Sequence, residues 1–542
     1  MLLLRSAFPF SRGFSSLKAV LIVFALGWDC PTPLQAQPPY FRWVRKAGGV
    51  ADEAGNGIAV DGGGNSYVTG YYKSASATFG ATVLTNAGGA EVFVAKYDSA
   101  GNLAWARRAG GNSNDFGNSI AIDGAGNSYV TGYFQSTNAN FSGTILTNTG
   151  SANVFTAKYD SSGTLLWARK AGGTGYDAGN GIAVDVAGNC YVTGFFYSTN
   201  AVFGGISLTN SGQNNVFITK YDGAGNVVWA KQAGGTSFDL GFAVAADAAG
   251  NSYVAGNFFS PTMGFGGGIT LTNSGENDVF VAKYDPSGTP LWARQVKGTS
   301  DDFAYGIAVD AGGNSYVTGN FLSPIATFRT GVTITNVGHN DVFVAKFDPA
   351  GNAIWARSAG GSSDDYSYAV TMDQATNVYI SGNFFSTNAN FGGLMLTNSG
   401  SHDVFTAKFD NSGSVLWAKQ AGGAGAESGN GIGVDAGGNS YLTGYFSPTN
   451  ASFSGILVTN IGLNDLFLAK LDGDVPTLSF SRNGNLLVLG WPTNQSGFTL
   501  ESTPALASNN NWTTVTTAPA ILGNQNFVTN SFGNGGFFRL RK

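Results

Sequence analysis

Residues 105–111 read W-A-R-R-A-G-G, and the pattern W-[AV]-[RK]-x-[AV]-[GK]-G occurs seven times in the chain. Successive tryptophans stand 62, 62, 62, 63, 63 and 62 residues apart. A period held this closely leaves almost no room for insertions, so each copy is one structural unit that packs against the next. The tryptophans are Trp43, Trp105, Trp167, Trp229, Trp292, Trp355 and Trp417.

Each copy contains four short runs rich in Val, Ile, Tyr and Phe. They read G-I-A-V-D, N-S-Y-V-T-G-Y-F, D-V-F-V-A-K-Y-D and N-L-x-W-A-R-x-A, with turn residues between them and no helical apolar stripe. Four antiparallel strands repeated seven times are typical of a β-propeller. The sequence therefore predicts an all-β chain, with a seven-bladed β-propeller of four-stranded blades over residues 41–472.

Two recurring turns support this interpretation, since Asp binds backbone amides ahead of it and Gly adopts positive φ. A calcium loop is the alternative, but each turn has one carboxylate and lacks the distal Glu of an EF-hand. We therefore expect structural hairpins. D-x-x-G-N follows the first strand at Asp61, Asp123, Asp185, Asp247, Asp310 and Asp435, and D-x-x-G follows the third at Asp98, Asp160, Asp222, Asp285, Asp348 and Asp410.

The consecutive pattern G-I-A-V-D-x-x-G-N-S-Y-V-T-G and D-V-F-V-A-K-Y-D-x-x-G-N-x-x-W resembles the SBBP repeat, a seven-bladed β-propeller repeat of secreted and surface proteins. The resemblance covers about residues 41–472. Its second half also resembles the repeat of quinoprotein-type propellers, which include non-enzymatic scaffold proteins. The SBBP resemblance implies a fold and a secreted or cell-surface location, and it implies no established activity.

The first and last copies of the repeat are each incomplete. The first copy supplies only a fourth strand, at 41–47, and the last copy ends on a third strand, at 465–472. We expect these two segments to pair in one blade as an N-/C-terminal latch. Between the second and third strands, each copy also carries an insertion of about twenty residues, longer than a hairpin needs. It predicts a small extra hairpin anchored by Phe79, Phe141, Phe203, Phe265, Phe328, Phe391 and Phe453.

The first 36 residues have the features of a signal peptide. Arg5, Arg12 and Lys18 precede the apolar run 19–28, and Ala36 is a small residue at a cleavage position. Ten apolar residues are too few to span a bilayer, so we expect a secreted, extracellular or cell-surface protein with no transmembrane segment after cleavage. Cleavage would remove Cys30 and leave Cys190 as a buried thiol.

Composition limits the partners. Charged residues make up 11% of the chain and hydrophobic residues 43%, which suits a folded rather than a disordered protein. Without residues 1–36 the chain carries 25 basic and 32 acidic residues, a net charge of −7. This sign disfavours nucleic acid and anionic membranes as partners. An extracellular protein or glycan, bound by a monomer, is the expected interaction.

Residues 475–542 fall outside the repeat. They contain a hairpin around Asn483-Gly484 and further short apolar runs such as G-F-T-L-E-S-T and G-F-F-R-L. The segment predicts a small C-terminal β-domain that resembles terminal modules of other secreted bacterial proteins. A sorting or attachment role and a stabilising cap are both open.

Familiar catalytic motifs are absent from the sequence. Only His339 and His402 exist, too few for a three-ligand catalytic zinc site, and there is no G-x-S-x-G, H-E-x-x-H or phosphate-binding loop. No cofactor is expected. Whether the protein binds a metal ion stays open, and calcium is the candidate ion. Propeller enzymes that use carboxylates alone are not excluded.

One set of acids lies four residues after the G-G of each fourth strand, where the loop leads to the next blade. One interpretation is ion pairing between blades together with loop capping, with the recurring basic residues as partners. The other is a cation site, or catalytic carboxylates, at the mouth of the central channel. The acids are Glu53, Asp115, Asp177, Asp239, Asp302, Asp365 and Glu427; the bases are Lys96, Lys158, Lys220, Lys283, Lys346, Lys408 and Lys470 on third strands, and Arg45, Arg107, Arg169, Lys231, Arg294, Arg357 and Lys419 on fourth strands.

The sequence therefore predicts a non-catalytic binding or structural module that uses one loop face of a propeller for protein or glycan contacts. Near-identical copies favour this function, because an active site usually requires some copies to break the pattern. A carboxylate-dependent lyase or glycosidase with its site at the channel mouth is the alternative. The most informative observation would be whether the channel mouth forms an asymmetric pocket or a symmetric ring.

Overall fold

The computed structural model describes residues 19–23, 39–447, 450–473, 478–483, 486–492, 498–503, 512–522, 525–531 and 537–541. The chain divides into two compact units, Tyr40–Asp472 and a second unit made of Met1–Pro39 with Gly473–Lys542. Every regular element in the described residues is a β-strand. Among these residues, no helix is long and apolar enough to cross a membrane.

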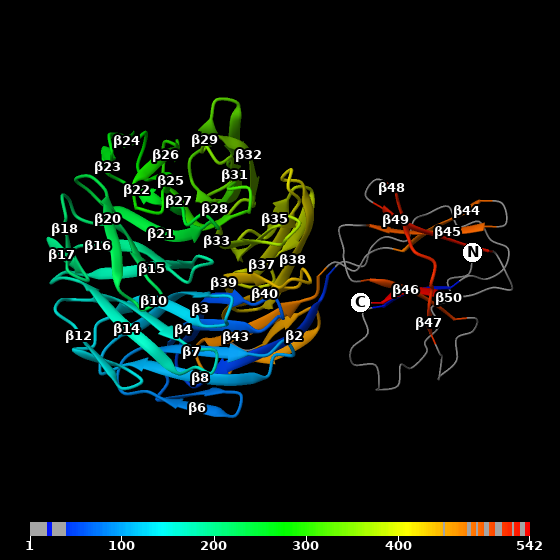
Figure 1. The fold of residues 1–542 in the computed structure, drawn as a ribbon, viewed down its shortest axis with the longest axis horizontal. Helices are drawn as coiled ribbons and strands as arrows, with labels where there is room; N and C mark the ends of the chain where they lie inside the picture. The colour runs from blue at the N-terminus through cyan, green and yellow to red at the C-terminus, as the bar shows by residue number, and fades with distance from the viewer. Residues whose placement is uncertain are drawn as a thin grey trace. The chain divides into compact units, whose positions relative to one another are not determined.

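Tyr40–Asp472 is built from groups of four antiparallel strands, which Figure 1 shows arranged around a common centre. The first strand of each group lies innermost and the fourth outermost. The first strands are β3 (Glu53–Val60), β9 (Asp115–Ile122), β15 (Asp177–Val184), β21 (Asp239–Ala246), β27 (Asp302–Val309), β33 (Asp365–Met372) and β39 (Ala426–Val434). The second strands are β4 (Ser66–Tyr72), β10 (Ser128–Phe134), β16 (Cys190–Phe196), β22 (Ser252–Phe258), β28 (Ser315–Phe321), β34 (Val378–Phe384) and β40 (Ser440–Ser447).

The third and fourth strands complete each group. Third strands are β7 (Glu91–Tyr97), β13 (Asn153–Tyr159), β19 (Asn215–Tyr221), β25 (Asp278–Tyr284), β31 (Asp341–Phe347), β37 (Asp403–Phe409) and β43 (Asp465–Leu471). Fourth strands are β8 (Leu103–Gly110), β14 (Leu165–Gly172), β20 (Val227–Ala233), β26 (Pro290–Val296), β32 (Ala353–Ala359) and β38 (Val415–Gly423), and the last group takes its fourth strand from the other end of the chain, as β2 (Phe41–Gly48).

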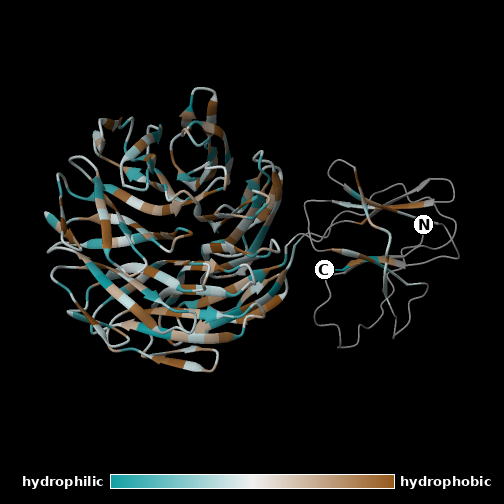
Figure 2. Cartoon of the chain, in the orientation of Figure 1, coloured by the Kyte–Doolittle hydropathy of each residue, from teal (hydrophilic) through white to brown (hydrophobic). Residues whose placement is uncertain are grey.

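The cores lie between neighbouring groups. Second and third strands such as β10 and β13 are buried on both faces, because each sheet is covered by a sheet on either side. Fourth strands such as β8 alternate between buried and exposed residues. Figure 2 shows hydrophobic and hydrophilic residues along the strands of each group.

The repeated tryptophan joins one group to the next. Trp105 Nε1 donates to the carbonyl oxygen of Ser161 at 3.1 Å, in the next group's hairpin turn. Gly163 in that turn has φ +81°, and a Cβ there would lie 2.7 Å from the Trp105 ring. Tryptophan and glycine therefore recur together because the indole needs a turn that lacks a side chain.

The insertion between second and third strands folds as the predicted hairpin. Its first strand pairs with the end of the preceding group's fourth strand, as Phe141 does with Ala109, so the hairpin also links two groups. All seven predicted anchor phenylalanines are buried. The hairpins are β5 (Ser76–Phe79) with β6 (Thr82–Thr85), β11 (Asn138–Phe141) with β12 (Thr144–Thr147), β17 (Asn200–Phe203) with β18 (Ile206–Thr209), β23 (Thr262–Gly266) with β24 (Ile269–Thr272), β29 (Ile325–Arg329) with β30 (Val332–Thr335), β35 (Asn388–Phe391) with β36 (Leu394–Thr397), and β41 (Asn450–Phe453) with β42 (Ile456–Thr459).

The second unit contains two further sheets. One has the strand order β1-β50-β46-β47 and the other β44-β45-β49-β48. Strand β1 lies inside the predicted leader, and the other leader residues lie outside the described residues. The strands are β1 (Ala19–Val23), β44 (Ser479–Asn483), β45 (Leu486–Pro492), β46 (Thr499–Thr503), β47 (Thr513–Thr514), β48 (Ala520–Leu522), β49 (Gln525–Ser531) and β50 (Phe537–Arg541).

The D-x-x-G-N turns form the predicted asparagine and glycine hairpins, and one copy departs from the pattern. Asp61 Oδ1 accepts from the backbone N–H groups of Gly63 and Asn65 at 3.0 and 2.9 Å. In the sixth copy the glycine is replaced by Thr376, which has φ +61°. A β-branched residue in the left-handed region is strained.

We therefore expect Thr376→Gly to stabilise the chain by about 1 kcal/mol, because the relieved strain exceeds the extra chain entropy of glycine. Thermal unfolding followed by calorimetry measures this difference. The matched control is Gly438→Thr, which places threonine at the equivalent position with φ +73° and should lower the melting temperature. A Thr376→Gly variant no more stable than the parent would contradict the strain argument.

Candidate functional site

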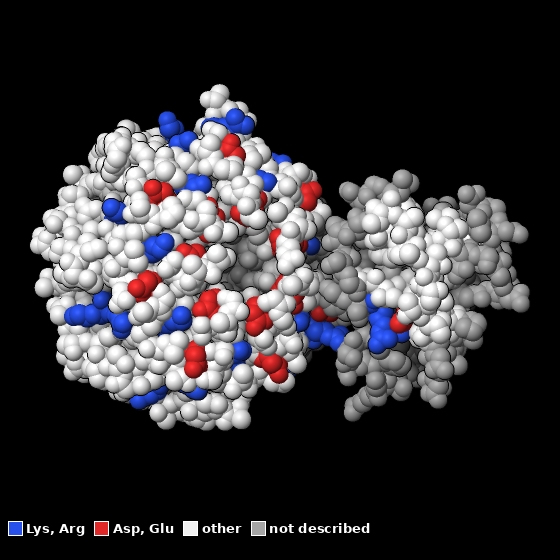
Figure 3. All heavy atoms as spheres, in the orientation of Figure 1, with Lys and Arg blue, Asp and Glu red and all other residues white. Residues whose placement is uncertain are grey.

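The predicted acidic ring lies at the entry to the innermost strands. Each acid is the first residue of its strand, except Glu427, which is the second residue of β39. All seven side chains are at most 1% exposed. The acidic side chains that surround the central hollow in Figure 3 therefore belong to other positions. A cation or ligand role for the ring stays a prediction, whereas its burial is a structural observation.

These acids cap the loops around them. Asp115 Oδ2 accepts from the backbone N–H of Gly111 at 2.9 Å and from Ser136 Oγ at 2.6 Å. Its Oδ1 accepts from the backbone N–H groups of Gln135 and Ser136 at 3.0 and 3.1 Å. The carboxylate thus holds the incoming loop against the loop that follows the second strand. The same arrangement recurs at Asp177, Asp239 and Asp365. Asp302 keeps the bonds to Ser323, but the backbone N–H of Gly298 donates to Asp278 instead.

The recurring bases bind elsewhere, so the expected ion pairing between them and the ring acids is wrong. Lys158 Nζ lies 4.6 Å from the Tyr129 ring centre and 3.7 Å from Asp123 Oδ2 of a D-x-x-G-N turn. Arg107 Nε donates to the Gly163 carbonyl oxygen at 2.9 Å in the next group's turn. A rigid hairpin turn offers these cations oxygen ligands and aromatic faces at the opposite end of the strands.

A second acid faces the ring acid at several junctions. The space beside Gly422 is bounded by Asp403 Oδ1 and Glu427 Oε2, and that beside Gly360 by Asp341 Oδ1 and Asp365 Oδ2. The Oδ1 atoms of Asp341 and Asp403 are buried and have no hydrogen-bond donor.

Burial and the facing carboxyl group both favour the protonated forms of these pairs. The pKa of Glu427 is raised to about 8, chiefly by burial and in part by the Asp403 charge, while the hydrogen bond from the Gly423 backbone N–H lowers it. Burial also raises the pKa of Asp341 to about 7, with a contribution from Asp365. Burial raises the pKa of Asp302 to about 7, with a smaller contribution from Asp278.

The central pocket is formed by a different set of residues. It has a volume of about 390 Å³ and is lined by three consecutive residues from each of the seven innermost strands, among which none of the seven predicted acids is found. Each strand has a β-bulge there: Gly55 pairs with Gly70 and Gly57 pairs with Thr69, so Asn56 has no partner across the ladder. A bulge re-aims its side chain. The seven bulge residues are Asn56, Asn118, Asn180, Phe242, Tyr305, Tyr368 and Asn430.

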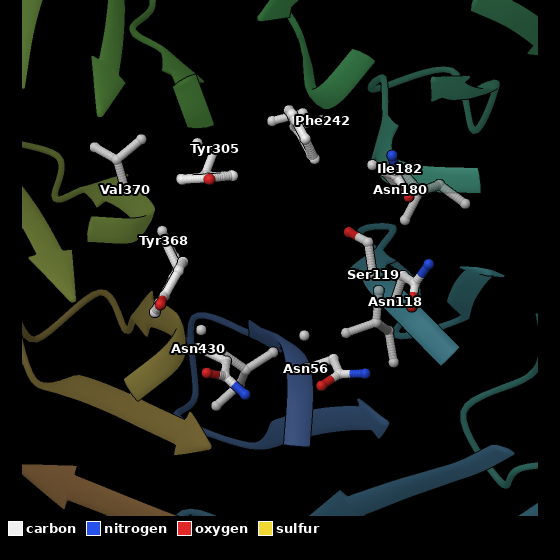
Figure 4. A pocket seen from close by; sticks show the side chains of 18 of the residues that line it. Asn56, Asn118, Ser119, Asn180, Ile182, Phe242, Tyr305, Tyr368, Val370 and Asn430 are labelled. Carbon is white, nitrogen blue, oxygen red and sulfur yellow. The ribbon is translucent and has the colours of Figure 1, made fainter. Parts of the chain in front are cut away.

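The pocket is asymmetric, as Figure 4 shows. Three consecutive strands contribute an aromatic arc, Phe242, Tyr305 and Tyr368, and the other four contribute an amide arc of asparagines. In the aromatic arc the ring centres lie 5.0 Å apart for Phe242 and Tyr305, and 5.7 Å apart for Tyr305 and Tyr368. Some copies therefore break the pattern at the channel, so the pocket is not the symmetric ring that identical copies would form.

Sequence reasoning missed these positions although a signal was present. Each bulge residue lies three positions after the ring acid, and this position is Asn in four copies and aromatic in three consecutive copies that are otherwise similar. Only the bulge reveals that it faces the channel, because regular alternation would assign it to a sheet face.

The remaining candidates from the sequence lie apart. His402 is buried and stacks on Phe385 with ring centres 4.3 Å apart, and burial lowers its pKa to about 4. His339 is exposed and lies 4.0 Å from Asp364. Cys190 is buried, and burial raises the pKa of its thiol. In the part of the chain that the structure describes, no group of three or more His, Cys, Asp or Glu side chains could hold a metal ion.

A family model described as a beta-propeller repeat, SBBP, matches residues 104–142, 291–320 and 416–445. These segments are SBBP repeats. Each begins on a fourth strand and continues through the first two strands of the next group, so an SBBP repeat straddles two groups. The repeat thus includes one Trp, one ring acid and one bulge residue. It defines a propeller-type repeat and assigns no ligand.

Two relatives and a solved structure are similar to this chain. An uncharacterized WD repeat-containing protein of Acanthamoeba polyphaga mimivirus is 25% identical over 76% of this chain and 36% of its own length. Regulatory protein FlaEY of Caulobacter vibrioides is 28% identical over 33% of this chain and 19% of its own length. The chain therefore spans about a third or less of these relatives. The Neurospora crassa Pan2 WD40 domain is 12% identical, with a TM-score of 0.37, over 80% of this chain and 97% of its own.

Proposed function

We propose that Tyr40–Asp472 closes as a seven-bladed β-propeller and serves as a non-catalytic, protein-binding module of a secreted or cell-surface protein. Pairing of β2 with β43 supports closure by a latch, since Val44 pairs with Ala469 and Ala47 with Leu466. The leader-like residues 1–36 support export. The repeat architecture, shared with a WD repeat-containing relative, suits protein interaction.

An exposed aliphatic patch carries the proposal. Val50, Ile461 and Leu463 are 77%, 59% and 61% exposed. Val50 is far from Ile461 and Leu463 in the sequence, but the two segments adjoin. The backbone N–H of Leu463 donates to the Ala51 carbonyl oxygen at 3.3 Å, and Asp52 and Asn464 form an isolated parallel β-bridge. Clustered exposed apolar side chains on a rigid loop face are typical of a protein contact. We name these three residues the aliphatic patch.

The face opposite these loops carries the D-x-x-G and D-x-x-G-N turns, and the turns themselves expose few large hydrophobic side chains. In the described D-x-x-G and D-x-x-G-N turns, Val186 is the single large hydrophobic residue that is exposed. Loops that connect fourth strands to first strands, and those around the hairpins, hold the aliphatic patch together with Phe238 and Phe259, whose backbones are joined by a 2.9 Å hydrogen bond. Beside these turns, the second residue of five fourth strands is an exposed aliphatic residue, and each of these residues lies in a different group: Leu166, Val228, Leu291, Ile354 and Leu416. The loop face is proposed as the contact surface because two adjoining segments there carry several exposed apolar side chains.

The catalytic alternative has less support. The seven carboxylates on which it depends are buried, bind loop amides and do not line the pocket. A glycan partner at the loop face is left as an outcome of the binding experiment.

The aliphatic patch predicts a specific loss of binding. Val50→Asp with Leu463→Asp should abolish capture of the protein partner from envelope and culture fractions, because charged side chains would be buried without partners in the contact. Affinity capture with mass spectrometry measures this loss, and unchanged thermal unfolding shows that the variant is folded.

The matched control is Val186→Asp on the turn face, where the side chain is 84% exposed. It should capture the same partner as the parent chain. If Val186→Asp alone removed the partner, or if glycans competed fully with it, the protein-binding proposal for the loop face would fail.

A further inference from the structure

We propose that the central pocket is a binding site for a neutral saccharide, held between the aromatic arc and the amide arc. This proposal goes beyond the loop-face function, because it uses none of the residues of the aliphatic patch. Three features of the pocket support it: its neutrality, its stacking platform and its fixed amides.

The pocket is polar without being charged. Its lining contains Asn, Ser, Tyr, Phe, Gly, Ala, Val and Ile side chains and no acidic or basic residue. The recurring lysines lie over tyrosine rings at the turns, as Lys220 does over Tyr191 at 5.0 Å, so they are committed elsewhere. A charged ligand would lose its hydration without gaining an ion pair. The ligand class is therefore uncharged.

The aromatic arc provides a rigid stacking platform. Tyr305 stacks on Phe303 with an interplanar angle of 5°, and Tyr368 stacks on Tyr366 with an angle of 10°. These neighbours hold the rings that border the pocket. Aromatic faces attract the polarised C–H groups that one side of a sugar ring presents.

The amide arc is held in one orientation. Nδ2 of Asn56 donates to the Gly117 carbonyl oxygen at 3.0 Å, and Asn118 and Asn180 donate to Gly179 and Gly241 at 2.9 Å. One N–H of each amide thus fixes the side chain against the next strand. An amide has a second N–H and an acceptor oxygen, and these suit ligand hydroxyl groups.

Space and complementarity select a saccharide among neutral ligands. The residues that follow the bulge residues are small, including Gly57, Gly181 and Gly306, because neighbouring innermost strands approach closely there and a Cβ would lie within 3.0 Å of the next strand's backbone. The volume of about 390 Å³ falls in the range of small-ligand sites. An apolar face opposite a row of amides matches a molecule with a C–H face and a hydroxyl edge. A proline-rich peptide would use the aromatic arc and could accept hydrogen bonds from the amide N–H groups, but its prolines have no N–H to donate to the amide oxygens.

The test uses the full chain with methyl glycosides of glucose, galactose, N-acetylglucosamine and rhamnose. Saturation-transfer NMR and calorimetry should detect at least one of them at millimolar concentration. Tyr305→Asn with Tyr368→Asn should weaken that binding about tenfold or more. Four copies already carry Asn at this position, so the fold tolerates the substitution locally.

Tyr305→Phe with Tyr368→Phe is the matched control, since it keeps both rings and should retain binding. It also separates stacking from folding if the asparagine variant is unstable. Methyl glucuronide and a polyproline peptide are the competing probes. The proposal is overturned if no neutral glycoside binds, if the asparagine variant binds as well as the parent, or if only the peptide or the glucuronide binds.

Discussion

Deleting residues 41–47 is expected to unfold Tyr40–Asp472 or lower its melting temperature by many degrees. The segment supplies most of strand β2, which pairs with β43 on one side and with β5 on the other. Its loss would expose a strand edge in the last group, and an unpaired edge also promotes aggregation. Calorimetry and light scattering of the deletion variant measure both effects.

The size of this effect follows from burial. Phe41 and Val44 belong to the core of the last group, whereas Trp43 and Ala47 belong to a core that includes the first group. Removing two large aromatic residues and one Val from such cores costs more than about 5 kcal/mol. That loss is comparable to the whole stability of a domain.

Tyr40→Ala is the control, because this exposed residue precedes the strand: its carbonyl oxygen, which the substitution keeps, accepts from the Asp472 backbone N–H, and its side chain makes a long, exposed hydrogen bond with Arg42. It should leave the melting temperature nearly unchanged. A deletion variant as stable as the parent would rule out the latch, and with it closure as seven blades.

Raising the pH from about 4 to about 8 is expected to reduce the stability of Tyr40–Asp472 by several kcal/mol. The acids Glu427, Asp302 and Asp341 have folded-state pKa values of about 8, 7 and 7, above their ordinary values of 4.5 and 3.8. A group whose folded pKa is raised binds its proton more tightly in the native state. Its stabilising effect is complete below the unfolded pKa and is lost as pH rises through the folded pKa.

Two other groups of the chain already carry the residue that tests whether facing carboxyl groups cause this pH dependence. Asn153 and Asn215 occupy the position of Asp341 and Asp403 in two other groups, at the start of a third strand. Asp403→Asn should therefore raise stability at pH near 8 by about 2 kcal/mol, because Glu427 no longer faces a second carboxyl group. It should have less effect at pH near 4, where Glu427 is protonated and carries no charge to repel Asp403.

Urea unfolding at the two pH values measures the difference. Equal stability at both pH values would contradict proton binding by these pairs. Thermal unfolding with added calcium tests the cation interpretation of the ring. If a cation occupies a carboxylate pair, calcium should raise the melting temperature of the parent chain at pH near 8. Calorimetry that shows no such rise would rule that interpretation out.

The sequence by itself determined the all-β character, the repeat and its turns. These features depend on local chemistry: Asp and Gly at fixed spacing form hairpins wherever they occur, and Val, Ile, Tyr and Phe in short runs form strands. The seven buried phenylalanines of the insertions were also predictable, because one apolar residue recurs in each polar segment.

Only the tertiary structure decided how the recurring charges and the channel are arranged. Glu53 and Lys96 look equally available for pairing in the sequence, yet they lie at opposite ends of the strands, since Glu53 begins a first strand and Lys96 lies next to the last residue of a third strand. The bulge at Asn56 and Tyr305 depends on register between strands, which no local pattern specifies. The aliphatic patch combines residue 50, near the start of the unit Tyr40–Asp472, with residues 461 and 463 near its end. These two segments meet only because β2 pairs with β43.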